Sequence, residues 1–217
     1  MNQRSRTCLS LLVLACFVAM SLAPALAEQP DAKKGWISLF NGKDLSGWKP
    51  RDGEKPKPNG WKVVDGVYVN TPPSTDIMTE REFYDFDLYA EVNVAETTNS
   101  GLYLRDKYEV QILNSFGKPL SENVCGALYR RIAPAVNACK PPGEWQTFEV
   151  TFVGRRLTVT HNGQKLHDAV DVGPKGTGNS SERPDGPGPL RLQGDHQEVS
   201  FRNMWIRPRP GTAGKRR

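Results

Sequence analysis

The segment "SGLYLRDKYEVQILN", residues 100–114, contains side chains that could do chemistry. Its apolar and polar residues alternate as in a β-strand. The apolar residues of this alternation are Leu102, Leu104, Val110 and Ile112, and they are expected to pack on a core. The polar residues on the opposite face are Tyr103, Arg105, Glu109 and Gln111. A carboxylate, a guanidinium, a phenol and an amide on one face can bind a polar ligand and transfer a proton. The alternative is a solvated outer face of a sheet.

The turn between these strands decides which side chains meet. A two-residue turn would place apolar residues opposite charged ones, because a one-residue slip exchanges the two faces of a strand. A three-residue turn over residues 106–108 keeps the faces separate. This register predicts that Arg105 lies opposite Glu109 as a charge pair about 5 Å apart, and that Tyr103 lies opposite Gln111.

The remainder of the chain predicts further short strands and no amphipathic helix. Alternating segments are "WISLF", "GWKVVDGVYV", "FYDFDLYAEVNV", "WQTFEVTF" and "RLTVTHNGQKL". Asn162-Gly163 is a strong hairpin signal, and the change of phase in "VSFRNMWIRP" predicts a bulge near Asn203. Many short strands separated by turns indicate one β-sandwich or jelly roll over residues 35–208, with 173–189 as a long surface loop.

The ends of the chain are expected to lie outside this sandwich. Residues 1–27 have the basic start, apolar run and Ala25-Leu26-Ala27 pattern of a secretory signal peptide. We therefore expect an exported, periplasmic or extracellular protein, with a lipoprotein anchored at Cys16 as the alternative. Residues 28–34 and the basic tail 209–217 are expected to be disordered.

Charge excludes one class of partner. The formal net charge is +5, from 29 Lys+Arg against 24 Asp+Glu, but basic residues of the signal peptide and of the last three positions account for this excess. The folded body is thus close to neutral and carries no basic stripe, so we expect no nucleic-acid partner. The apolar run near the N-terminus is short for a membrane span, and we expect no stable one.

Cys125 and Cys139 are the cysteines that remain after signal cleavage. In an exported protein they predict a disulfide, which would stabilise the fold by roughly 3 kcal/mol, or alternatively two separate buried thiols. No cysteine spacing resembles a zinc site, so we expect no metal and no cofactor. Calcium at a sheet edge near Asp76, Asp85 and Asp87 remains an open alternative.

Several segments together resemble one family. They are "LFNGKDLSGW", "NSGLYLR", "YEVQILN", "CGALY", "PPGEWQTFEV" and "GPLRLQGDHQEVSFRNMWIRP", in this order. From Trp36 to Pro208 the chain is similar to the 3-keto-disaccharide hydrolase family, whose members include 3-keto-glucoside 1,2-lyases and 3-keto-2-hydroxyglucal hydratases. The resemblance implies a concanavalin-like jelly roll of two antiparallel sheets. It also implies an exported enzyme that cleaves 3-keto-glycosides, supplied by a sugar 3-oxidising dehydrogenase.

The chemistry implied by the resemblance requires a base, an oxyanion stabiliser and an acid. A ketone at C3 acidifies the C2 proton, so a base can form an enolate, the glycosidic oxygen can leave and water can add back. We expect Glu109 and His196 to act as acid and base, with Arg105 orienting Glu109. The residues expected to bind the sugar are Tyr103, Gln111, Tyr129 and Trp145.

Some positions depart from the family pattern or are expected to be structural. Asn114 stands where the family often has Asp, and His196 lies one position later than the family's histidine. His161 precedes the hairpin and is expected to be structural, whereas His167 is expected on the surface. A non-catalytic carbohydrate-binding jelly-roll module is the alternative function, because one fold hosts many functions.

Overall fold

The computed structural model describes residues 30, 34–51 and 59–210. The predicted signal peptide, the alternative anchor at Cys16 and residues 211–217 of the predicted tail lie outside the described residues. Among the described residues, no helix is long and apolar enough to cross a membrane.

The secondary structure of the described residues consists of β-strands, without an α-helix. The strands are β1 (Ile37–Ser38), β2 (Trp48–Pro50), β3 (Trp61–Val64), β4 (Val67–Asn70), β5 (Ile77–Thr79), β6 (Phe86–Val94), β7 (Asn99–Leu104), β8 (Tyr108–Leu113), β9 (Trp145–Val153), β10 (Arg156–His161), β11 (Gln164–Asp171), β12 (Arg191–Leu192) and β13 (Val199–Pro208).

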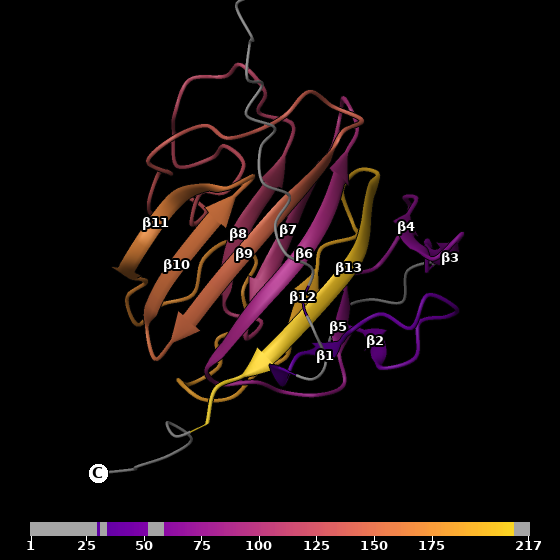
Figure 1. Cartoon of the computed structure of the whole chain (residues 1–217), viewed down its shortest axis with the longest axis horizontal. Helices are drawn as coiled ribbons and strands as arrows, with labels where there is room; N and C mark the ends of the chain where they lie inside the picture. Colours follow the sequence, from indigo (N-terminus) through magenta and orange to yellow (C-terminus); the bar gives the residue numbers. More distant parts are fainter. Residues whose placement is uncertain (1–29, 31–33, 52–58, 211–217) are drawn as a thin grey trace, which may run out of the picture.

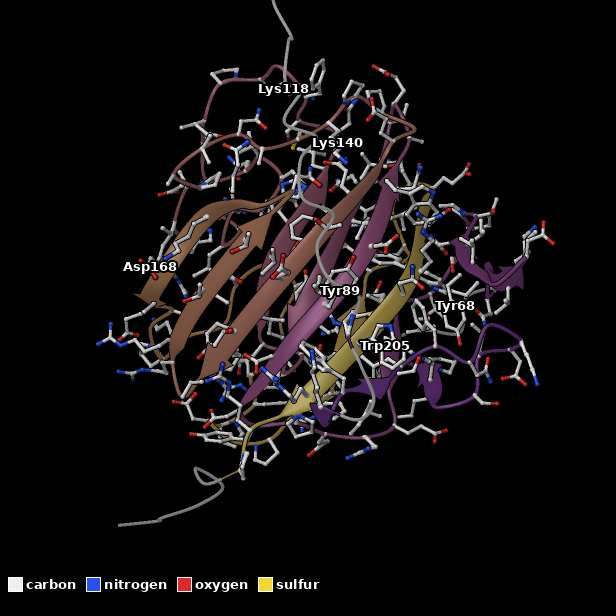
Figure 2. The ribbon with its side chains drawn as sticks, in the orientation of Figure 1. Tyr68, Tyr89, Lys118, Lys140, Asp168 and Trp205 are labelled. Carbon is white, nitrogen blue, oxygen red and sulfur yellow. The ribbon has the colours of Figure 1, made fainter. Side chains whose placement is uncertain are left out.

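The strands form two antiparallel sheets that pack as two layers (Figure 1). The larger sheet has the order β11-β10-β9-β6-β13-β4-β3, and β1 pairs with β13. The smaller sheet has the order β2-β5-β12-β7-β8 and lies behind the larger one in this view. Figure 2 shows Tyr89 and Trp205, which are cross-strand partners on β6 and β13, over the larger sheet.

The core lies between the sheets and follows from the alternation of apolar residues. On β6, Leu88, Ala90, Val92 and Val94 are all buried, as the sequence predicts. Phe152 packs edge-on against Phe86 of its own sheet and against Tyr108 of the smaller sheet, at centroid distances of 6.0 and 5.5 Å. Burial of each such ring contributes about 1.5–3 kcal/mol. These layers confirm the predicted jelly-roll sandwich.

Two local predictions are also confirmed. Residues 162 and 163 turn the chain between β10 and β11, with φ of 48° at Asn162 and 77° at Gly163. The pairing of β13 with β6 shifts between Arg202 and Trp205, and Asn203 there has φ of 46°. The bulge returns the following residues of β13 to the core face.

The pairing of β7 with β8 differs from the predicted register. Tyr103 lies opposite Glu109, and Gly101 lies opposite Gln111. The turn comprises residues 105–107, one position earlier than predicted, because Arg105 and Asp106 adopt left-handed conformations with φ of 56° and 52°. Tyr103, Glu109 and Gln111 stay on the predicted polar face, but Arg105 lies in the turn and the predicted Arg105–Glu109 pair is wrong.

Two further expectations are corrected. Cys125 and Cys139 are free thiols in the structure, so the predicted disulfide is not formed there. His167 is buried rather than on the surface, and its Nε2 lies 2.8 Å from the carbonyl oxygen of Gly126.

Candidate active site

A cavity of about 330 Å³ lies on the face of β7 and β8 that points away from the core. Strand residues form its floor, and residues from the 173–189 loop and from the segments before β9 and after β12 form its walls. Its lining residues are Asn99, Tyr103, Glu109, Gln111, Tyr129, Arg130, Gly178, Asn179, Gln193 and His196.

A row of cross-strand neighbours crosses the floor of this cavity. Arg191 of β12 lies beside Tyr103 of β7, and Tyr103 lies beside Glu109 of β8. The Tyr103 hydroxyl donates a hydrogen bond of 2.8 Å to Glu109 Oε2. A carboxyl, a phenol and a guanidinium are thereby aligned by sheet pairing alone.

The carboxyl of Glu109 is held by several further contacts. The surroundings of the Gln111 amide favour the orientation in which its nitrogen donates to Glu109 Oε1 at 3.0 Å and to the Ser100 carbonyl at 3.0 Å. The backbone N–H of Glu109 donates to Thr177 Oγ1 at 2.7 Å. The carboxyl therefore has a defined orientation on the cavity floor.

The environment of Glu109 shifts its ionisation. Only 3% of the residue is exposed. Burial raises the pKa of Glu109 to about 7, although the Tyr103 hydrogen bond and the nearby Arg191 charge oppose that rise. A carboxyl with a pKa near the working pH can both accept and return a proton, which suits general acid–base catalysis.

Two glycines make room for this carboxyl. A Cβ added at Gly101 would lie 2.7 Å from Glu109 Oε1. A Cβ added at Gly178, which has φ of +60°, would lie 1.7 Å from Glu109 Oε2 and 2.7 Å from the Tyr103 hydroxyl. The loop after β11 can approach Glu109 only because residue 178 lacks a side chain.

Arg191 is fully buried and holds the other side of Tyr103. Its guanidinium carbon lies 3.4 Å from the centroid of the Tyr103 ring. It donates to Asp106 Oδ1 at 2.6 Å, to Asp76 Oδ2 and to the Asn179 carbonyl at 2.7 Å. The backbone N–H of Asn179 in turn donates to the Tyr103 hydroxyl at 3.1 Å. Burial, the Glu109 charge and the hydrogen bond to Glu109 raise the pKa of Tyr103, so the phenol stays protonated.

His196 lies at a more exposed part of the cavity. Its Nδ1 lies 2.5 Å from Asp195 Oδ1, in the loop that follows β12. A carboxylate at this nitrogen favours the tautomer whose Nε2 has a free lone pair. His196 and Glu109 line the same cavity, which therefore contains two side chains that can exchange protons.

Residues 126–130 run alongside β8 and bring Tyr129 to the cavity. The Gly126 N–H donates to the Gln111 carbonyl at 2.8 Å, and the Tyr129 N–H donates to the Glu109 carbonyl at 3.0 Å. This pairing places Tyr129 and Arg130 in the cavity wall.

The structure thus brings together most of the residues expected from the sequence, namely Tyr103, Glu109, Gln111, Tyr129 and His196. Arg105 and Trp145 do not line this cavity. The Arg105 guanidinium donates to the Gly154 carbonyl and lies 3.9 Å from the Phe152 ring centroid. Trp145 is on β9 of the larger sheet, under the guanidinium of Arg202 at 4.0 Å.

Arg191 and its partners Asp76, Asp106 and Asn179 were not predicted from the sequence as site residues. A signal for Arg191 existed, because it stands between the buried residues Leu190 and Leu192 in "GPLRLQGD". A charged residue alternating with buried leucines is the same pattern that indicated Glu109. Its partners come from distant parts of the chain and gave no local signal.

A second groove, of about 410 Å³, lies on the outer face of the larger sheet. Among its charged residues, Arg207 and Arg209 donate to the carboxylate of Asp87 at 2.8 and 2.6 Å. Paired in this way, Asp87 has a lowered pKa, so it is not poised to exchange a proton near neutral pH. The smaller cavity around Glu109 is therefore the stronger candidate site.

The fold has counterparts among known proteins. A crystal structure of a candidate glycosyl hydrolase from Parabacteroides distasonis is 31% identical, with a TM-score of 0.70, over 81% of this chain and 84% of that one. A second candidate glycosyl hydrolase from the same organism is 25% identical, with a TM-score of 0.69, over 82% of this chain and 95% of that one. The Crh5 transglycosylase shares the fold at 13% identity and a TM-score of 0.54, over 82% of this chain and 85% of that one.

A search of curated proteins gave no match. The family model described as "3-keto-alpha-glucoside-1,2-lyase-like domain" matches residues 35–207, which includes every strand except the last residue of β13. The motifs that first suggested this resemblance supply the floor of the cavity and part of its walls, at Tyr129, Gln193 and His196. The chain therefore belongs to the 3-keto-α-glucoside-1,2-lyase-like family.

Proposed function

We propose that this protein cleaves 3-keto-glycosides, and that Glu109 is its principal base. The observation that carries the proposal is the buried carboxyl of Glu109, hydrogen-bonded to Tyr103 at 2.8 Å and lining one cavity with His196. Family membership and the similarity to candidate glycosyl hydrolases support a carbohydrate substrate.

In the proposed reaction, the carboxylate of Glu109 removes the C2 proton of the sugar. The electrons of the C2–H bond form an enolate with the C3 ketone. Side-chain amide and guanidinium groups of the cavity wall, at Asn179, Gln193 and Arg130, are donors for the negative oxygen. A pKa of about 7 leaves much of Glu109 ionised at neutral pH and keeps it basic enough to act.

Elimination then breaks the C1–O bond and forms a C1=C2 double bond. Protonated His196 gives its proton to the departing glycosidic oxygen, which leaves as an alcohol. Hydration reverses the bond changes: water adds its oxygen to C1 and gives a proton to neutral His196, and protonated Glu109 returns a proton to C2. The net reaction is hydrolysis of the glycosidic bond, and an early release of the intermediate yields the unsaturated sugar.

Export of the protein and supply of its substrate are further parts of the proposal. The signal-peptide pattern of residues 1–27 supports export. A 3-keto sugar must be made by oxidation of a secondary alcohol, so a sugar 3-oxidising dehydrogenase is the expected source of substrate.

The second candidate function is a non-catalytic carbohydrate-binding module. A binding module has no need of a buried carboxyl held between a phenol and an amide in the same cavity as a histidine. That arrangement favours the enzyme.

Purified protein should be incubated with a 3-keto-glucoside that carries a chromogenic leaving group, and with its unoxidised parent glucoside. We expect release of the leaving group from the keto compound only, because only the ketone acidifies C2–H. NMR of the product distinguishes the unsaturated sugar from the hydrated one. Binding of both compounds without any release would support the binding module and contradict the proposal.

A further inference from the structure

Cys125, Cys139 and His161 form a cluster outside the cavity. Both sulfur atoms and one ring nitrogen of His161 lie within 4.8 Å of one another. Cys125 and Cys139 belong to the long connection between β8 and β9, and His161 is the last residue of β10. No other group of three or more His, Cys, Asp or Glu residues of this kind occurs among the described residues.

His161 is a buried side chain with an unused lone pair. Its ring has 0% exposure and stacks on Phe148 at a centroid distance of 4.2 Å. Its Nε2 lies 3.0 Å from Gln146 Oε1, which accepts a hydrogen bond, and 3.2 Å from Asn162 Nδ2. Its Nδ1 has no hydrogen-bond partner. With Nε2 donating to Gln146, Nδ1 carries a free electron pair.

We propose that Cys125, Cys139 and His161 bind a zinc ion. Zn–S bonds of about 2.3 Å and Zn–N bonds of about 2.0–2.1 Å place tetrahedral ligand atoms roughly 3.5–3.8 Å apart, which this cluster reaches by small side-chain movements. A disulfide would use the two sulfurs and leave Nδ1 of the buried imidazole without a partner. Zinc uses all three groups, and the contact of Nε2 with Gln146 is the outer hydrogen bond that metal-binding histidines make.

The charges of this site favour a divalent ion. Binding releases one proton from each thiol, and two thiolates neutralise Zn²⁺, so no net charge is buried. Figure 2 shows Lys118 and Lys140 at the same end of the molecule. Cys139 is partly exposed, which allows a water molecule to complete four-coordination.

A zinc ion here would fasten the β8–β9 connection to the larger sheet. Cys125 directly precedes the segment that pairs with β8 through Gly126 and Tyr129. The site is therefore structural, because none of its protein ligands lines the cavity.

The test is a metal titration of the full protein, reduced and desalted without oxygen. Co²⁺ serves as the spectroscopic probe, and Zn²⁺ is then added in competition. We expect one Co²⁺ per chain with thiolate-to-cobalt charge-transfer bands, displaced by one Zn²⁺. His161→Phe keeps a ring on Phe148 but removes the nitrogen ligand, and should weaken zinc binding roughly 100-fold, because even outer-partner losses cost 10–100-fold. Cys139→Ser, at a partly exposed position, should abolish the charge-transfer bands.

His167→Phe is the matched control, because His167 is also a buried histidine, on the neighbouring strand, but lies outside the cluster. It should bind zinc like the unchanged protein. The proposal is overturned if the reduced protein takes up no stoichiometric zinc, if it binds Cu⁺ alone, or if His161→Phe binds zinc as tightly as His167→Phe. Circular dichroism verifies the fold of each variant, and Cys139→Ser decides the outcome if His161→Phe does not fold.

Discussion

Tyr103 and Glu109 are directly opposite on β7 and β8, and the tyrosine hydroxyl donates a hydrogen bond of 2.8 Å to the carboxyl. The guanidinium of Arg191 lies against the ring of Tyr103. The contact is made between neighbouring strands of a sheet, so its geometry is set by backbone pairing and not by a loop. This is the kind of rigid placement that proton transfer requires.

Removal of the tyrosine hydroxyl should reduce the fraction of Glu109 that is ionised at neutral pH. The hydrogen bond favours the ionised carboxyl and lowers its pKa, so Tyr103→Phe should raise that pKa and reduce the carboxylate present at neutral pH. Because hydrogen bonds to charged groups are worth about 1.5–3 kcal/mol, we expect turnover at pH 7 to fall about 10-fold. The pH profile of kcat/KM is the measurement, and a midpoint that stays in place or moves to lower pH would contradict the assignment.

Arg191→Met should destabilise the protein strongly. It leaves the buried carboxylates of Asp76 and Asp106 without their cation, and breaking a buried ion pair costs about 3–5 kcal/mol. Urea unfolding at pH 7 measures the effect. Arg155→Met is the control, because its pair with Asp171 is exposed and should be worth about 0–1 kcal/mol. Equal losses of stability in the two variants would show that Arg191 does not support the site in this way.

Gly178→Ala should reduce activity through a direct clash with Glu109. The new Cβ would lie 1.7 Å from Glu109 Oε2, so either the carboxyl or the loop must move. Gly154→Ala is the matched control, since Gly154 has a similar φ of +56° with open space around its Cβ position. Both variants should lose about 1–2 kcal/mol of stability from backbone strain. Only Gly178→Ala should lose turnover, and equal activities would mean that the close approach is unimportant.

Much of the fold could be predicted because it depends on local patterns. A few adjacent residues specify each of three features: the alternation along β6, the Asn162-Gly163 hairpin and the bulge at Asn203. The faces of the residues that stay within β7 and β8 were predicted for the same reason. Moving the turn by one position shifts which residues pair, but Tyr103, Glu109 and Gln111 remain on the polar face.

The remainder of the candidate site depends on contacts that no local pattern specifies. Arg105 leaves the polar face because it adopts a turn conformation, and Arg191 reaches Tyr103 from a strand far along the chain. The pKa of Glu109 follows from burial by the 173–189 loop, whose Gly178 allows the approach. The proximity of His161 to the cysteines likewise follows from sheet packing, so cysteine spacing alone predicted no metal.

Glu109→Gln should change how stability depends on pH. The folded pKa of about 7 exceeds the ordinary value of 4.5, so the folded state binds the proton more tightly than the unfolded chain. Stability that comes from this proton is complete below pH 4.5 and is lost as the pH rises through about 7. The glutamine variant has no such loss. Its free energy of unfolding relative to the unchanged protein should therefore rise by on the order of 3 kcal/mol between pH 4 and 8. Urea unfolding across this range checks the slope, and a difference that is flat or falls with pH would contradict the raised pKa.

The most direct test of the proposed chemistry is the rate of cleavage of a 3-keto-glycoside by Glu109→Gln across pH. The variant keeps the size of the side chain and removes the base. We expect kcat to fall by about 10²-fold or more, within the usual range for a positioned acid–base group, and the ionisation near pH 7 to disappear from the profile of kcat/KM. Turnover close to that of the unchanged protein, with the same ionisation still present, would contradict the assignment of Glu109 as the base.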